Sequence, residues 1–468
     1  MNPAGSQMTT RSAPEWDTLR NALDGELILP GAPDYEQARR PAIPRFDDAH
    51  PRAVVRCRTT GDVSEVLALA RRAGLDVAVR SGGHCFAGRS SGDGVVLDVS
   101  PMRSVSYSDG VATVGAGARL GDVYDALDDH GVTIPAGCGP EVGIAGLTLG
   151  GGLGILGRRH GLTADQLIGA RVVLAGGRVV DCDEHHDEEL FWALRGAGGG
   201  QFGVVTSLAF RTVPAPAATS FHVVWPGESA AALIEAWQSW APDAPDEMAA
   251  SLLVTAEAGS PLAVNLFGAM AGSEADAGPL LAEFVARGGH EPTEIAIEHL
   301  PYRATKSYLA ERGPGDAPEG WHPYSKSEYF RRPLSTDAIE SLLDNLAAAR
   351  STRETRVLDF TPWGGAYNRV AADATAFAHR EERFLIKHGV MLDPEAPAEE
   401  QQAARRWLTR SWEIVHPFGS GGVYANFPDP ELDDWERAYH GDNYARLARV
   451  KAEYDPANVF TFPQSVRA

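Results

Sequence analysis

A Gly-Gly-His loop directly follows a predicted strand near the start of the chain. The segment reads VRSGGHCFAG over residues 79–88, and the apolar alternation before the glycines predicts a strand over residues 76–80. Apolar residues at helical spacing upstream predict a helix, with Thr60 as its N-cap and Gly74 as its stop. The loop is therefore expected at the carboxyl end of a strand, where α/β sheets bind their ligands.

Many short strands follow, so the pattern predicts an α+β fold. The segments GVVLDVS, RSVSYS and GVATVGAG read as strands. A Pro/Ala cluster over residues 213–218 reads as a linker, and the composition beyond it is richer in Trp, Pro and acidic helices. From about Pro417 the chain returns to Gly, Tyr, Asn and Asp. These shifts predict a domain boundary at the linker and a distinct final segment.

The charge of the chain argues against nucleic acid and anionic lipid as partners. Its 468 residues include 63 acidic and 42 basic ones, a formal net charge of -21 that repels polyphosphate. We therefore expect a small-molecule partner, with no nucleic acid and no membrane. No apolar run suits a secretory signal or a bilayer span, so a cytoplasmic protein is expected. The four cysteines are expected as free thiols.

Two glycine-rich stretches are candidate cofactor sites. Gly198, Gly200 and Gly203 satisfy G-x-G-x-x-G, but a predicted helix precedes them and a predicted strand follows. That order is the reverse of a nicotinamide-binding turn, so such a site is not expected. The run GIAGLTLGGGLGILGRRHGL, residues 143–162, suits backbone lying against a flat or phosphate-bearing ligand, or alternatively a tight chain crossing.

No metal site is expected. Cys182, His185 and His186 lie together in DCDEHHDEE, but their spacing fits no closed zinc pattern. The acidic surroundings instead predict a solvated loop.

Six segments in order resemble the berberine bridge enzyme-like oxidases of the vanillyl-alcohol-oxidase/PCMH flavoprotein superfamily. They are VRSGGHCFAG, GIAGLTLGGGLG, ELFWALRGAGGGQFGVVT, GGAYNRVAADATAFAHR, GVYANFPDPE and YDPANVFTFPQSV. The resemblance implies an α+β fold with a two-part PCMH-type FAD-binding domain, plus a substrate domain of antiparallel sheet and helices. The implied boundaries are an N-terminal segment at 1–45 packing on the FAD domain, the FAD-binding domain at 46–215, the substrate domain at 216–416, and a C-terminal segment at 417–468 returning to the FAD domain.

The resemblance implies FAD as the cofactor. In the family the RSGGH loop wraps the FAD pyrophosphate, and its histidine, here His84, is bonded covalently to the flavin. The alternative is a histidine that only hydrogen-bonds within a turn. The implied cofactor-binding residues are Arg80, Ser81, Gly82, Gly83, His84, Gly88, Cys138, Val142, Gly143, Gly146, Gly150, Gly151, Gly154, Gly203, Val205 and Asn426.

A second flavin link through Cys138 is left open. Many relatives carry the linking cysteine in C-P-x-V-G, whereas this chain reads AGCGPEVG, with Cys138 one position earlier. A shift of one residue in an extended segment turns the side chain to the opposite face, unless the loop is irregular. We therefore expect attachment through His84 alone. Cys85, where relatives often carry serine, is expected as a small packed residue.

Hydride removal from an alcohol needs a base for the hydroxyl proton. Strand alternation in GSGGVYANFPD places Tyr424 and Asn426 on one face, and the resemblance implies Tyr424 as the base and Asn426 as a flavin contact. A packed tyrosine with a satisfied hydroxyl is the alternative. Some relatives place an acidic residue near Asp359 to assist the tyrosine, so Asp359 is a candidate catalytic residue. Its expected role is otherwise that of an exposed or capping carboxylate.

Aromatic residues bear on the substrate. Phe86 stands where carbohydrate-oxidising relatives often carry tyrosine, which argues against a direct sugar oxidase. Trp321, Trp363 and Tyr367 could form an aromatic wall for a planar or glycosylated substrate, or could belong to the core.

These observations predict an FAD-dependent oxidase, a monomer or homodimer. It would take hydride from a carbinol or hemiacetal carbon of a sugar, glycoside or natural-product alcohol and reduce molecular oxygen to hydrogen peroxide. The alternatives are oxidative cyclisation or C–N/C–C oxidation of a secondary metabolite, and a non-catalytic binding protein with a flavin fold.

Overall fold

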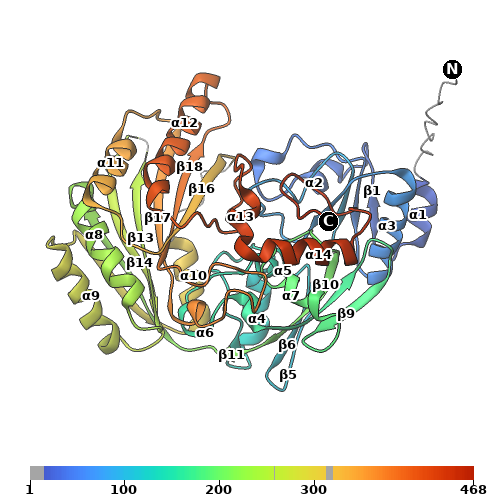
Figure 1. Ribbon diagram of the computed structural model, residues 1–468, viewed down its shortest axis with the longest axis horizontal. Helices are drawn as coiled ribbons and strands as arrows, with labels where there is room; N and C mark the ends of the chain where they lie inside the picture. Colours follow the sequence, from blue (N-terminus) through green and yellow to red (C-terminus); the bar gives the residue numbers. More distant parts are fainter. Residues whose placement is uncertain (1–14, 258, 313–319) are drawn as a thin grey trace.

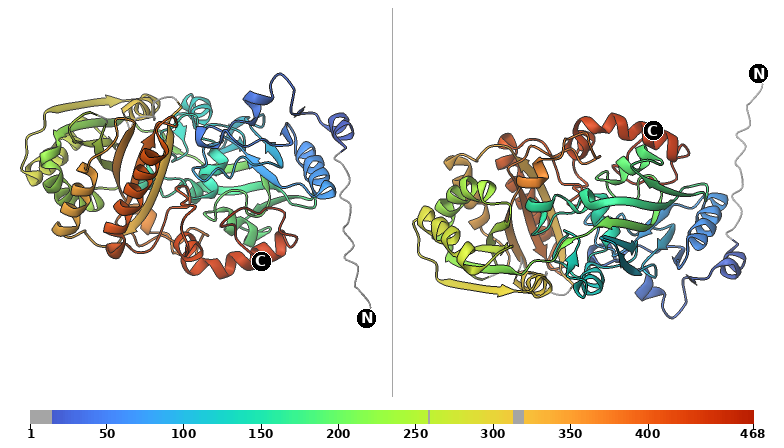
Figure 2. Two further views of the ribbon diagram at one scale, coloured as in Figure 1. Left: turned by 90° about the horizontal axis from the view of Figure 1, so that it is seen from above. Right: turned by 90° about the horizontal axis from the view of Figure 1, so that it is seen from below.

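The computed structural model describes residues 15–257, 259–312 and 320–468, and shows two halves side by side along the long axis (Figures 1 and 2). Residues from both ends of the chain lie in one half, and the middle of the chain forms the other (Figure 1). The first 14 residues of the expected segment 1–45 lie outside the described residues. Among the described helices, none is long and apolar enough to cross a bilayer.

A small, mostly parallel sheet carries the Gly-Gly-His loop. Its order is β1-β2-β4-β3, with β2, β4 and β3 parallel and β1 antiparallel. The strands are β1 (Glu26–Ile28), β2 (Ala53–Arg56), β3 (Val77–Arg80) and β4 (Val95–Asp98). Helix α3 (Thr60–Ala73) connects β2 to β3, and α1 (Trp16–Ala22) and α2 (Tyr35–Arg39) precede the sheet's second strand. The glycines after β3 therefore lie at a strand end, as the apolar pattern predicts.

The N-cap of α3 is Thr59, one residue before the expected Thr60. The Thr59 side chain accepts a hydrogen bond from Asp62 N, and the Asp62 carboxylate accepts one from Thr59 N. Because the acidic residue stands three positions after Thr59, only Thr59 can complete this reciprocal pair. Gly74 ends the helix in the left-handed conformation, as expected.

A five-stranded antiparallel sheet completes this half. Its order is β5-β6-β10-β8-β9: β5 (Val105–Ser108), β6 (Val111–Gly115), β8 (Leu167–Val173), β9 (Val179–Asp183) and β10 (Val204–Arg211). The helices here are α4 (Leu120–Asp128), α5 (Ile144–Leu149), α6 (Gly157–His160), α7 (Glu188–Leu194) and α14 (Tyr444–Tyr454), and β7 (Val132–Thr133) pairs with β11 (Val213–Pro214). Leu447 and Tyr454 of α14 share one buried core with strands of both sheets, so the end of the chain packs into its beginning.

The other half is a seven-stranded antiparallel sheet of order β15-β12-β14-β13-β17-β18-β16. Its strands are β12 (Ala218–Pro226), β13 (Met248–Ala256), β14 (Ala263–Met270), β15 (Glu294–Leu300), β16 (His322–Phe330), β17 (Glu354–Pro362) and β18 (Phe384–Leu392). Four helices share an apolar core with one face: α8 (Ala230–Trp240), α9 (Glu274–Gly288), α11 (Thr336–Ala347) and α12 (Ala398–Val415). Helix α10 (Tyr302–Arg312) lies between the halves, and α13 (Trp435–His440) precedes α14 (Figure 1). The predicted α+β class, with an antiparallel sheet and helices in the middle of the chain, is confirmed.

A buried ion pair ties the end of the chain to the glycine turn before β10. Lys451 Nζ lies 2.7 Å from the Asp455 carboxylate, and both side chains are 0% exposed. The same ammonium group donates to Gln201 O at 2.6 Å and to Phe460 O at 2.7 Å. These contacts satisfy all three of its N–H groups, so the pair joins α14, the GGGQFG turn and the tail.

Replacing Lys451 with Met is expected to lower the free energy of unfolding by about 3–5 kcal/mol, because Asp455 is then a buried charge without its partner. Urea unfolding followed by tryptophan fluorescence measures the change. Arg449→Met, an exposed position on the same helix, is the matched control and is expected to stay within about 0.5 kcal/mol of the parent. Equal effects of the two substitutions would contradict this account.

Candidate active site

Several glycines of the predicted cofactor segments serve close backbone crossings. A Cβ on Gly82 would overlap Gly143 N, so the Gly-Gly-His loop and the start of α5 touch through their backbones. A Cβ on Gly154 would overlap Ala136 O, and one on Gly203 would meet Val172 Cγ1 at 2.6 Å. Gly146 differs, because no atom lies within 4 Å of an added Cβ. The glycine run thus serves as a tight crossing at some positions and leaves open space at another.

The loop after β3 has donors that the described part of the chain does not use. The backbone N–H groups of Gly82, Gly83 and Cys85 have no hydrogen-bond partner among the described residues. The Oγ atoms of Ser90 and Ser91 are buried and likewise lack a described partner. Several unpaired N–H and O–H groups on one glycine-containing loop are suited to an anion such as a pyrophosphate. The loop therefore fits the phosphate portion of FAD.

Arg80 and Ser81 hold this loop in place. The Arg80 guanidinium is buried and donates to Ser90 O at 3.0 Å, to Ala38 O at 2.6 Å and to Arg39 O at 2.8 Å. Ser81 Oγ donates to Ala116 O at 2.7 Å. The N–H groups of Arg80 donate to carbonyl groups of the protein. Arg80 therefore supports the loop and is not expected to bind a ligand directly.

The remaining predicted cofactor residues lie around this loop. His84 and Cys85 are half-buried. Gly88 has a positive φ of 71° and backs onto the Phe46 ring, and Gly151 backs onto Phe377. Val142 O accepts from Leu120 N at 2.9 Å, and Val205 is buried on β10. Cys138 is half-buried beside an apolar cluster that contains Ala218 and Tyr308, at the junction of the two halves.

Tyr424 and Asn426 come together, although not through a strand. The structure forms a turn here, in which Phe427 N donates to Tyr424 O at 2.8 Å, so the predicted strand is wrong. Asn426 Nδ2 donates to the Tyr424 hydroxyl oxygen at 3.0 Å and to Leu147 O at 2.9 Å. A Cβ on Gly150 would overlap Asn426 Oδ1, so the amide needs a glycine there.

The Tyr424 hydroxyl receives a second N–H donor. Gly152 N donates to it at 3.0 Å, and the side chain is only 2% exposed. Burial raises the pKa of Tyr424 to about 12, and the hydrogen bonds from Asn426 and Gly152 oppose that rise. Two N–H donors aimed at one phenol oxygen stabilise negative charge on it, so the oxygen is arranged to carry a phenolate when its proton leaves.

Asp359 is buried, so its expected exposed or capping position is wrong. It lies in the middle of β17, directly opposite Lys387 of β18, with its carboxylate 3.8 Å from Lys387 Nζ. Thr361 Oγ1 donates to the carboxylate at 3.3 Å. Burial raises the pKa of Asp359, and the ammonium of Lys387 opposes the rise. Both side chains occupy the sheet face away from the covering helices.

Lys387 links Asp359 to the neighbourhood of Tyr424. Its Nζ lies 4.8 Å from the centroid of the Phe427 ring, and that ring lies 5.1 Å from the Tyr424 ring. Phe427 therefore contacts both Lys387 and the tyrosine. Lys387 is a neighbour of the site that the sequence did not predict. The only signal was a lysine inside the apolar strand FLIKHGVML.

Of the three residues predicted to form an aromatic wall, only Trp363 and Tyr367 lie together. Trp363 and Tyr367 are buried and stacked with ring centroids 4.4 Å apart, in one cluster with Tyr424 and Phe377. They form the packed support of Tyr424, which agrees with their alternative role in the core. Trp321 is half-buried and does not belong to this cluster. Phe86 lies 6.1 Å from Phe427 in an edge-to-face arrangement.

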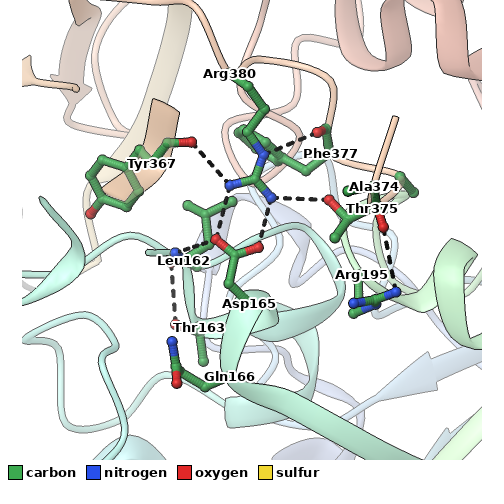
Figure 3. Close-up of polar contacts among 12 residues, drawn as sticks. Leu162, Thr163, Asp165, Gln166, Arg195, Tyr367, Ala374, Thr375, Phe377 and Arg380 are labelled. Atoms are coloured by element: carbon green, nitrogen blue, oxygen red, sulfur yellow. Dashed lines mark hydrogen bonds and ion pairs between the residues drawn. The ribbon is translucent and has the colours of Figure 1, made fainter. Parts of the chain in front are cut away.

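A buried ion pair between Arg380 and Asp165, which the sequence did not predict, joins the two halves (Figure 3). The Arg380 guanidinium binds both oxygens of Asp165 at 2.7 and 2.9 Å. It also donates to Thr375 Oγ1 at 3.0 Å and to Tyr367 O at 3.3 Å. Asp165 in turn accepts from Leu162 N at 2.8 Å. Arg380 and Asp165 are 215 positions apart, and no local pattern predicts such a pair.

The acidic loop with two histidines lies at the surface. The side chains of His185 and His186 are 75% and 72% exposed, and Cys182 is buried on β9. Within the described ranges, no group of three His, Cys, Asp or Glu side chains could hold a metal ion. All four cysteines are free.

Two family models match the chain. One, described as FAD binding domain, covers residues 51–183, and the other, described as Berberine and berberine like, covers residues 423–467. These matches cover the loop after β3 and the segment that holds Tyr424.

Curated relatives match along most of their length. The FAD-linked oxidoreductase YvdP of Bacillus subtilis is 33% identical, over 95% of this chain and 98% of the relative. The aclacinomycin-N/aclacinomycin-A oxidase of Streptomyces galilaeus is 33% identical, over 89% of this chain and 85% of the relative. The solved structure of Physcomitrella patens BBE-like 1 has a TM-score of 0.85 at 28% identity, over 96% of this chain and 98% of that one.

Replacing Asp165 with Asn is expected to lower the free energy of unfolding by about 3–5 kcal/mol, because Arg380 keeps a buried charge without an anion. Urea unfolding measures the change. Asp243→Asn is the matched control: Asp243 pairs with Arg383 at the same 2.7 Å, but its side chain is 62% exposed. That control is expected to cost less than about 1 kcal/mol. If Asp165→Asn lowered the free energy of unfolding no more than Asp243→Asn does, burial would not explain the strength of the Arg380–Asp165 pair.

Proposed function

The chain belongs to the berberine bridge enzyme-like family of FAD-linked oxidoreductases, and on that premise we propose that it is an oxidase acting on an alcohol or hemiacetal carbon of a sugar, glycoside or natural-product alcohol. Molecular oxygen is the proposed final acceptor, with hydrogen peroxide as the product. One observation carries the proposal: the buried Tyr424 hydroxyl lies at the meeting point of two N–H donors. FAD, when bound, supplies the two-electron acceptor.

The loop after β3 and the start of α5 are the proposed cofactor cradle. Gly82, Gly83 and Cys85 offer N–H groups to the phosphates, and Gly146 leaves room beside the helix. His84 is proposed as the covalent attachment point. A second attachment through Cys138 remains an alternative, because Cys138 lies in an irregular segment and not in a regular strand.

Tyr424 is the proposed base. A substrate hydroxyl placed at its oxygen would give up its proton there as hydride leaves the adjacent carbon. The donors from Gly152 and Asn426 stabilise the phenolate that must exist before the proton arrives. Asp359, held by Lys387, is proposed to act through its charge near the site, since Phe427 contacts both Lys387 and Tyr424.

Phe86 favours a natural-product alcohol or glycoside over a free sugar as the substrate. Its ring packs on Phe427, which packs on Tyr424, so the approach to the hydroxyl from this side is apolar. An apolar ring offers no hydrogen bond to a sugar hydroxyl. The similarity to the aclacinomycin-N/aclacinomycin-A oxidase agrees with this choice.

Acid precipitation of the purified yellow protein is expected to give a yellow pellet, with flavin mass on the peptide that contains His84 and none on the peptide that contains Cys138. Peptide mass spectrometry measures both. His84→Ala is expected to give a colourless pellet, and Cys138→Ala a yellow one. A colourless pellet from the parent protein would return His84 to a structural role, and a flavin joined to both peptides would establish the second link.

Tyr424→Phe is expected to lower kcat/KM on the order of a hundredfold, measured as substrate-dependent peroxide release from a panel of glycosides and phenolic alcohols. In the parent, kcat/KM is expected to rise with pH through the neutral range, because the deprotonated fraction of a group with a pKa of about 12 grows with pH. The variant should lose that dependence.

Tyr367→Phe is the matched control, since this phenol is also buried and contacts Gly154. It is expected to keep the pH dependence of the parent. An unchanged rate in Tyr424→Phe would remove Tyr424 from the mechanism. Anaerobic flavin bleaching without peroxide under air would replace the oxidase by a dehydrogenase.

A further inference from the structure

A small cavity opens where the cofactor-side loops meet the seven-stranded sheet. Its volume is about 170 Å³, and Arg45, Phe86, Tyr324 and Arg405 are among its lining residues. Phe86 follows His84 by two positions, Tyr324 lies on β16, and Arg405 lies on α12. The cavity is too small for a drug-sized ligand and suits one ring or one charged substituent of a larger molecule.

Two arginines at this cavity have no acidic partner among the residues that the structure describes. The guanidinium carbons of Arg45 and Arg405 lie 4.2 and 4.9 Å from the centroid of the Tyr324 ring. Arg405 Nη2 donates to the Tyr324 hydroxyl at 3.0 Å, and Arg45 donates to Phe86 O at 2.5 Å and to Pro323 O at 3.2 Å. These partners are neutral, so two positive charges beside one ring remain uncompensated.

The two carboxylates at the cavity are already engaged. Lys326 Nζ lies 2.8 Å from the Asp429 carboxylate and 3.0 Å from the Glu431 carboxylate. Together these three groups carry one negative charge, against two positive charges on Arg45 and Arg405. The cavity therefore has an excess of positive charge in a chain whose net charge is -21. Ser325 Oγ, which also belongs to the cavity wall, is buried and lacks a described partner.

The cavity lies beside residues that pack around the proposed base. Phe86 belongs to the cavity wall and lies 6.1 Å from Phe427, whose ring lies 5.1 Å from that of Tyr424. Pro428, the residue after Phe427, also lines the cavity. A molecule with its hydroxyl at Tyr424 could extend past Phe86 and Phe427 and place a substituent at the arginines.

We propose that this cavity is a binding subsite for an anionic group of the substrate, a carboxylate or a phosphate, held by Arg405 and Arg45 with Ser325 as a further donor. A planar guanidinium with N–H groups to spare is suited to an oxyanion, and an anion relieves the repulsion between two adjacent cations. The substrate is then an acidic glycoside or an acidic natural-product alcohol. The inference rests on the proposed function in taking the anion to be part of the substrate.

Calorimetric titration of the holoenzyme with matched glycosides tests the subsite by measuring binding. A phenyl glycoside has no hemiacetal carbon that the enzyme could oxidise. Phenyl β-D-glucuronide and phenyl β-D-glucoside differ only by a carboxylate in place of a hydroxymethyl group. The glucuronide is expected to bind about tenfold tighter, as one charge-assisted contact provides. That preference should shrink as the salt concentration rises from about 0.02 M to about 0.3 M, because salt screens the attraction.

Arg405→Met is expected to abolish the preference. Arg405 is exposed on α12, so its replacement leaves the fold intact. Arg406→Met is the matched control, because Arg406 is also exposed on the same helix and does not line this cavity; it should keep the preference. Equal binding of the two glycosides, binding of neither, or a preference that survives Arg405→Met would each overturn the subsite.

A third ligand distinguishes the two anions. Phenyl β-D-glucoside 6-phosphate binding tighter than the glucuronide would assign the subsite to a phosphate, and the reverse order to a carboxylate; both outcomes support an anion site. Because the titration needs no peroxide, binding that depends on Arg405 in a protein that oxidises nothing would retain the subsite and reject the oxidase. Peroxide release together with equal binding of the glucuronide and the glucoside would retain the oxidase and reject the subsite.

Discussion

The buried ion pair between Arg380 and Asp165 connects the two halves of the molecule close to the proposed active site. The two side chains are 1% and 8% exposed, so neither charge is stabilised by water. Placing two ions in a buried site costs solvation, which a pair repays only with well-formed geometry and further hydrogen bonds. Here the guanidinium has additional acceptors on Thr375 and Tyr367, and the carboxylate accepts from Leu162 N. The pair is best understood as a device that selects one arrangement of two chain segments.

From this pair a short chain of contacts leads to the tyrosine. Asp165 fixes Leu162 N, and the adjacent Thr163 N donates to Gly152 O at 2.9 Å. Gly152 N in turn donates to the Tyr424 hydroxyl. A Cβ on Gly152 would overlap Thr163 Oγ1, so the backbone comes this close only as glycine. The position of one N–H donor at the proposed base thus depends on a distant ion pair and on the absence of a side chain.

The sequence predicted those parts of the molecule that local patterns encode. The strand before the Gly-Gly-His loop, the glycine stop of α3 and the helix-then-strand order around GGGQFG follow from residues close together in the chain. The alternation in VYANF predicted a strand, but the structure has a turn there. The turn also places the side chains of Tyr424 and Asn426 on the same side, so the alternation alone does not distinguish the two conformations. The prediction of an exposed Asp359 was wrong because it considered only residues near in sequence. Its cross-strand neighbour Lys387, which the sequence does not reveal, stabilises the buried carboxylate. Arg380 and Asp165 are joined only by the tertiary fold, so no local pattern could reveal them.

The net charge of this protein and the charge around one cavity affect different kinds of ligand. A formal charge of -21 governs encounters with extended polyanions, which meet the whole surface at once. At physiological salt, charges on the surface are screened beyond about 8 Å, so a small ligand inside a cavity responds mainly to the groups beside it. At the cavity by Phe86 those groups are two arginines, with the nearby carboxylates already bound to Lys326. An acidic protein can therefore repel an extended polyanion and still bind one small anion at the proposed subsite, because the two effects act over different distances.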